Sequence, residues 1–258
     1  MKRFLLISLL MLAAVTSAFA CCAPFVSRYY IYYTPAQKTW SDRRDDALAA
    51  EWSQMLRTPV TPGDVQELDW RLKWKKDDPK YKTDNPIIDI CYDGRHVKLL
   101  EYLEFLSDCN EELRFSYDEW DYPSKEQIAR HEANLRSYAS IAAERTKGKF
   151  GSQYRLMQMR CAFALKDYPE CERLWNAAPK SGSIFTEMMR NLYAGVLYRT
   201  GRKTEAFAIY TDMGDTESAL WCAMKTGDLN NIKEFYAQNP NSSVIPYLIP
   251  ELCANVQE

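Results

Sequence analysis

The second half of the chain repeats itself, and this repeat constrains the fold more than any other feature of the sequence. Apolar residues recur 35 positions apart from Ser152 onward. The matching pairs are Met159 and Ala194, Ala162 and Leu197, Phe163 and Tyr198, Cys171 and Ala206, Leu174 and Ile209, and Trp175 and Tyr210. A third, shorter copy a further 26 positions on consists of Leu220, Ala223, Ile232, Phe235 and Tyr236. A repeat of this length indicates small units that stack, each packing only against its neighbours.

The repeat resembles the tetratricopeptide repeat (TPR), which has a period near 34 residues and consists of two helices. Ala194 stands where such repeats place a small residue in their first helix, and Gly201 stands at their turn. Ala206 and Tyr210 match the alanine and the aromatic residue of their second helix. The other copies carry Met, Leu, Cys or Ile where a small residue is usual, so the resemblance is to a degenerate TPR-like repeat.

This resemblance implies an all-α fold in which helical hairpins stack over residues 152–258, with a closing helix from 243 to 256. The composition agrees, because 49 Leu and Ala residues against 20 Val and Ile favour helices over strands. An irregular helical bundle with accidental periodicity is the alternative.

Residues 41–147 are predicted to form further helical hairpins. The expected helix starts are Ser41, Thr61 and Ser124, because each is a good N-cap residue and the last one opens a capping box. The helix from Ser124 should run to about Lys147. Its inner face is predicted to hold Ile128, Leu135, Tyr138 and Ala142. The short apolar run at 87–90 fits a strand or an apolar loop.

The first 20 residues have the features of a signal peptide. Lys2 and Arg3 precede an apolar run at 4–15, and Ala18-Phe19-Ala20 fits a cleavage site before Cys21. The run is shorter than the roughly 20 residues that span a bilayer. We therefore expect export to the periplasm or the cell envelope of a bacterium, or secretion.

Cysteine after the cleavage site raises a second interpretation, which is lipid attachment at Cys21. Bacterial lipoproteins usually carry Leu and then a small residue where this chain has Ala18 and Phe19. Lipidated and soluble forms both stay open, and a lipid at Cys21 would be the expected membrane contact. Residues 21–40 are rich in aromatic rings and are predicted to be irregular.

All eight cysteines follow the predicted cleavage site, where an oxidising compartment would let disulfides persist. They are Cys21, Cys22, Cys91, Cys109, Cys161, Cys171, Cys222 and Cys253. In the repeat register Cys161 ends the first helix of a hairpin and Cys171 begins the second, which predicts a Cys161–Cys171 bridge. The cysteine spacing and the two distant histidines, His96 and His131, predict neither a metal site nor a cofactor.

Charge and motifs narrow the function. A net charge of −2 without a basic stripe argues against nucleic acid. The sequence has no nucleophile motif or phosphate-binding loop, and Glu111-Glu112 fits a solvated acidic surface. We therefore expect a non-catalytic scaffold that binds a protein or peptide of the envelope in a groove lined by the first helices of the repeats. The predicted groove residues are Arg160, Asn191, Arg199, Trp221 and Lys225.

The alternative hypothesis is a carbohydrate-binding or carbohydrate-active helical protein. It depends on the 17 Tyr and 7 Trp residues of the chain and on one segment that mixes acids with rings, Asp118 to Tyr122. Carboxylates and ring faces are the groups that carbohydrate enzymes use.

Overall fold

The computed structural model describes residues 39–93, 96–115, 122–179, 182–223, 229–242 and 244–246. By its internal contacts the chain divides into a unit of residues 1–36 and a unit of residues 37–258, and the second unit holds all of the described residues. The predicted signal peptide, the lipidation site Cys21 and nearly all of the segment 21–40 lie outside the described residues. The same holds for Asp118–Asp121, Lys225 and most of the predicted closing helix.

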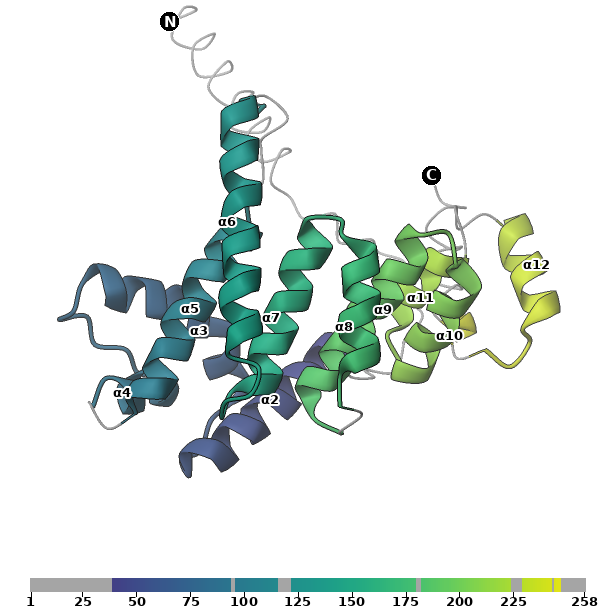
Figure 1. Cartoon of the computed structure of the whole chain (residues 1–258). Helices are drawn as coiled ribbons and strands as arrows, with labels where there is room; N and C mark the ends of the chain where they lie inside the picture. The colour runs from purple at the N-terminus through teal and green to yellow at the C-terminus, as the bar shows by residue number, and fades with distance from the viewer. Residues whose placement is uncertain are drawn as a thin grey trace, which may run out of the picture. The chain divides into compact units, whose positions relative to one another are not determined.

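The described secondary structure is entirely helical, which confirms the all-α prediction at this level. The helices are α2 (Trp40–Leu56), α3 (Pro62–Asp77), α4 (Pro86–Cys91), α5 (Val97–Leu113), α6 (Lys125–Glu144), α7 (Gly151–Ala164), α8 (Tyr168–Ala177), α9 (Ile184–Arg199), α10 (Lys203–Met213), α11 (Thr216–Ala223) and α12 (Leu229–Gln238). Figure 1 shows them in chain order.

Local capping explains where several of these helices begin. Thr61 and Ser124 form capping boxes at α3 and α6, as the sequence predicts. Helix α2 begins earlier than expected: Thr39 is its N-cap and exchanges hydrogen bonds with Asp42, so Ser41 lies inside the first turn. The apolar run at 87–90 belongs to helix α4, because the Asn85 side chain caps it and Pro86 occupies its first position.

Consecutive helices pack as neighbours from α5 to α11. Helices α5 and α6, α7 and α8, and α9 and α10 make contacting pairs, and each second helix also packs on the first helix of the next pair (Figure 1). The first two copies of the sequence repeat coincide with α7–α8 and α9–α10. Helices packed in adjacent pairs are compatible with a helical repeat.

The turn inside the pair α7–α8 is repeated in the pair α9–α10. Lys166 and Gly201 lie 35 residues apart, and both have left-handed backbone, with φ of +59° and +87°. The next residue at each turn donates from its backbone to a carbonyl five residues back, Asp167 to Ala162 at 2.9 Å and Arg202 to Leu197 at 2.8 Å. This is the hydrogen bond of a Schellman motif, which closes a helix and starts the next segment in a defined direction.

The core consists of three clusters of buried apolar residues along the chain. One joins α2–α7, the next joins α7–α9 with the start of α2, and the last joins α9–α12. Small residues permit close helix contacts: Ala194, Ala206 and Ala219 are each fully buried.

The hairpin of α2 and α3 does not extend the stack in sequence order. Helix α3 packs on α5, while α2 contacts α9. The start of α2 is also held at the end of α10, because Arg43 donates to the carbonyls of Met213 and Gly214 at 2.7 and 3.0 Å. The N-terminal hairpin therefore lies across helices that are far from it in sequence.

The left-handed turn at Lys166 generates a stability prediction. Lys166→Gly should raise the free energy of unfolding by about 0.5–1 kcal/mol, because glycine adopts positive φ without the steric cost that other residues incur. Gly201→Ala should lower the free energy of unfolding by about 1 kcal/mol, because alanine is strained at this positive φ. The added methyl group would meet no other atom, since the space around Gly201 is open. Urea unfolding measures both changes.

Lys166→Ala is the matched control, because it removes the same side chain and keeps a residue that is strained at positive φ. Its stability should stay close to that of the wild type. Equal stabilisation by Ala and Gly at this position would contradict the backbone explanation.

Candidate functional site

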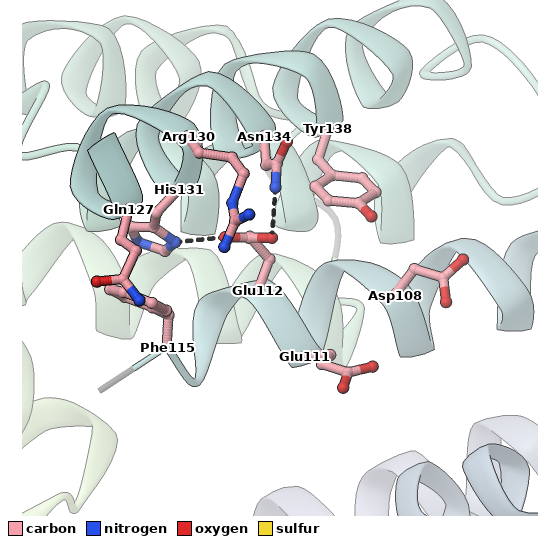
Figure 2. Close-up of a pocket in the computed structure, with 9 residues that line it drawn as sticks. All are labelled: Asp108, Glu111, Glu112, Phe115, Gln127, Arg130, His131, Asn134 and Tyr138. Carbon is pink, nitrogen blue, oxygen red and sulfur yellow. Dashed lines mark hydrogen bonds and ion pairs between the residues drawn. The ribbon is translucent and has the colours of Figure 1, made fainter. Parts of the chain in front are cut away.

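A polar cavity of about 390 Å³ lies between α5 and α6, and Figure 2 labels the nine residues that line it. Helical spacing places them on facing surfaces. The α5 side contributes Asp108, Glu111, Glu112 and Phe115, at positions i, i+3, i+4 and i+7. The α6 side contributes Gln127, Arg130, His131, Asn134 and Tyr138, which follow the same periodicity.

Glu112 is the centre of this cavity. One of its carboxylate oxygens lies 2.5 Å from Nδ1 of His131, and the other accepts a hydrogen bond from the Asn134 amide at 2.9 Å (Figure 2). The Glu112 and His131 side chains are only 19% and 17% exposed. Because an ionised carboxylate only accepts hydrogen bonds, Nδ1 of His131 is the donor in this contact.

Aromatic rings border this polar centre. Phe115 stacks on the His131 ring, with centroids 4.4 Å apart. Burial, together with the nearby carboxylate of Asp108, raises the pKa of Tyr138, so its hydroxyl stays neutral and can donate a hydrogen bond. Ring faces and hydrogen-bonding groups therefore line the same cavity.

The other carboxylates of the cavity form ion pairs with helix α3. Glu111 pairs with Lys73 at 2.7 Å, and Asp108 pairs with Lys76. The hydrogen bond from Lys73 lowers the pKa of Glu111, which keeps it ionised at neutral pH. Arg130 is exposed and lines the same cavity (Figure 2). The rim of the cavity therefore carries both negatively and positively charged side chains.

The structure places the predicted groove residues in different surroundings. Arg160 is half-buried and donates to the Asn110 side chain at 2.7 Å, and Asn110 in turn donates to Asp69 at 3.2 Å. These residues line a second cavity of about 140 Å³, where side chains of α2 and α3 cover α5, α7 and α9. The helix face that Arg160 was expected to present to a partner is therefore occupied by the α2–α3 hairpin.

The remaining groove residues lie toward the end of the described chain. The Asn191 amide donates to Asp215 at 2.8 Å, and Asp215 accepts from the backbone of Ser218 at the start of α11. Arg199 is exposed, and Trp221 is 68% exposed. Of the four groove residues that the structure describes, Arg199 and Trp221 are those that face solvent.

The predicted Cys161–Cys171 bridge is not formed in the structure, where both residues are free thiols. The Cys171 sulfur lies 3.7 Å from the Met159 carbonyl oxygen. The Cys161 sulfur instead lies 3.5 Å from that of Cys109. Within the described ranges, no group of three His, Cys, Asp or Glu residues could hold a metal ion.

The Glu112–His131 pair is not predicted above, although the sequence contains a signal for it. Glu112 does not belong to a solvated surface: it continues the buried stripe of Phe105 and Cys109 at positions i, i+4 and i+7. His131 likewise precedes Leu135 by four residues, on the inner face predicted for α6. A polar residue that shares the helical spacing of buried apolar residues indicates a hydrogen-bonding partner on the facing helix.

No protein-family model matches this chain, and neither a curated protein nor a solved structure matches it. Among the described helices, none is both long enough and apolar enough to cross a membrane.

The geometry around Glu112 predicts that removing this carboxylate lowers stability more than removing its neighbour Glu111. Glu112→Ala should lower the free energy of unfolding by about 1–3 kcal/mol, because His131 and Asn134 lose their common acceptor in a half-buried position. Glu111→Ala is the control and should cause a clearly smaller loss, since its ion pair with Lys73 is exposed. Urea unfolding of both variants checks this difference, and equal losses would contradict it.

Proposed function

We propose that this protein is an exported, non-catalytic TPR-like scaffold that binds a protein or peptide partner in the bacterial cell envelope. The observation that carries the proposal is the repetition of one unit: two helix pairs 35 residues apart share a left-handed Schellman turn, and their equivalent residues are buried, Met159 with Ala194 and Cys171 with Ala206. Stacked hairpins of this kind present successive first helices to an extended partner.

The exposed part of the partner face lies on α9 and α11. Arg199 supplies a cation there and Trp221 supplies a large ring, and these are the residue types that dominate binding energy at protein interfaces. Helices α2 and α3 already cover the corresponding face of α5 and α7. We therefore propose that the partner binds at the C-terminal end of this face, on α9 and α11.

The lining of the α5–α6 cavity supports binding in preference to catalysis. Two of its carboxylates are held in ion pairs, Glu111 with Lys73 and Asp108 with Lys76. Its most buried acid, Glu112, already accepts hydrogen bonds from two side chains. A carboxylate held in this way is suited to orient its neighbours.

Site-specific crosslinking tests the scaffold proposal. A photo-crosslinking amino acid in place of Trp221 should capture one envelope protein in living cells, and Arg199→Glu should lower this capture several-fold. The control position is Trp74, which is 51% exposed and belongs to α3, outside the proposed partner helices. Equal capture at both positions, or capture that does not respond to Arg199→Glu, would show that the partner does not use this face.

The α5–α6 cavity favours a second candidate function, which is carbohydrate binding. Carboxylates, amides and two aromatic rings surround a space of about 390 Å³, and such sites combine stacking with several hydrogen bonds. The chain from Phe115 to Tyr122, which contains the predicted acidic and aromatic segment, joins the two helices that form the cavity. We interpret this cavity as the place where a sugar would bind.

A glycan array followed by calorimetry tests this second function. Arg130→Ala should lower the affinity for a captured glycan about tenfold or more, since Arg130 is an exposed residue of the cavity lining. Arg136→Ala is the control, because Arg136 lies on α6 outside the cavity and pairs with Glu132. Absence of any glycan ligand, or equal binding by both variants, would contradict this function.

A further inference from the structure

Two cysteines that are far apart in sequence meet inside the protein. Cys109 lies on α5 and Cys161 on α7, 52 residues later, and their sulfur atoms are 3.5 Å apart. Both residues are fully buried in the apolar cluster that joins α2–α7. The helices on which they lie are in direct contact.

The other described cysteines have different surroundings. Cys171 is as deeply buried as Cys161, but its sulfur faces the Met159 carbonyl oxygen. Cys91 and Cys222 are free thiols, as are Cys109, Cys161 and Cys171 in this structure. The Cys109–Cys161 contact is therefore specific to the packing of α5 on α7.

We propose that Cys109 and Cys161 form a disulfide bond as the chain folds in an oxidising compartment. The proposal rests on the export that we propose above. A disulfide requires a sulfur–sulfur distance near 2.05 Å, so the two sulfurs must approach by roughly 1.5 Å. Rotation of the two side chains about their Cα–Cβ bonds moves the sulfurs by a comparable distance, and the helices can stay packed.

The oxidant is a second disulfide, carried by a small thiol compound or by a thiol-oxidising protein. The Cys161 thiolate attacks one sulfur of that disulfide, forms a mixed disulfide and releases the first oxidant thiolate. Cys109 then loses its proton and attacks the Cys161 sulfur, which forms the bond between the two residues and releases the second oxidant thiolate. Two protein thiols are oxidised and one disulfide is reduced to two thiols.

Local chemistry makes Cys161 the first nucleophile of this sequence. The positive charge of Arg160, its neighbour in the chain, favours the Cys161 thiolate even before the helices pack. Burial excludes an oxidant once α5 has packed on α7. The exchange therefore takes place during folding, before the pair is enclosed.

Peptide mapping of the full chain tests the pairing. The reduced protein is unfolded, refolded in a mixture of reduced and oxidised glutathione, quenched with acid, alkylated and digested without reduction. Mass spectrometry should find the Cys109 peptide linked to the Cys161 peptide, with Cys91, Cys171 and Cys222 alkylated. Alkylation of both members of the pair, or a link from either one to another cysteine, would overturn the proposal.

Thermal unfolding supplies a second measurement. The refolded, oxidised wild type should melt about 5–15 °C above the reduced protein, because the bond restricts the unfolded chain. Cys109→Ser and Cys161→Ser should each abolish this difference, while the control Cys171→Ser should keep it. A difference that persists in Cys109→Ser would contradict the pairing, and mapping of the wild type decides the question if a variant does not fold.

The purified-protein tests do not depend on where the chain resides. Cell fractionation tests the export itself. If the chain were found in a reducing compartment while the purified protein formed the bond, the proposed location would be overturned and the pairing of Cys109 with Cys161 would be supported.

Discussion

The packing around helix α7 is the constraint on which the rest of the structure depends. Helices α5, α6, α8 and α9 all contact α7, and its buried residues point to opposite sides. Tyr154, Met157 and Cys161 belong to the cluster that joins α2–α7, whereas Leu156, Met159 and Ala162 belong to the cluster that joins α7–α9. One helix therefore links the N-terminal helices to the repeat. A helix buried on opposite faces also lacks the one-sided apolar pattern of a surface helix.

Two polar networks on α5 complement this apolar packing. On one side Asn110 connects Asp69 of α3 to Arg160 of α7, and on the other Glu112 holds two side chains of α6. Partly buried polar groups destabilise a fold unless they are hydrogen-bonded. The second network is open to a cavity, so side chains that join two helices also form the walls of the candidate binding site.

The position of the α2–α3 hairpin decides how much of the repeat face is free for a partner. Its apolar side chains Leu48, Trp52 and Leu68 meet Leu156 of α7 and Phe185 of α9 around the smaller cavity. These contacts bury a face that an isolated stack of hairpins would expose. The proposed partner surface is therefore confined to the end of the stack near Trp221, while the polar cavity near Glu112 is a separate surface.

The sequence by itself determined the features that depend on residues close together in the chain. Thr61 and Ser124 cap the helices that they were expected to begin, and the 35-residue offset places Lys166 and Gly201 at equivalent turns. Such features are local, because a cap or a turn is closed by hydrogen bonds within a few residues. The Leu and Ala excess likewise predicted helices, since helix propensity acts residue by residue.

Only the tertiary structure decided which buried faces meet. The periodicity of α5 and α6 indicates an inner face for each helix, but it does not say that Glu112 pairs with His131. Sequence spacing predicted that Cys161 would pair with Cys171 ten residues away, whereas helix packing places it beside Cys109. Contacts of this kind join residues far apart in the chain, and they are set by the shapes of all the packed side chains together.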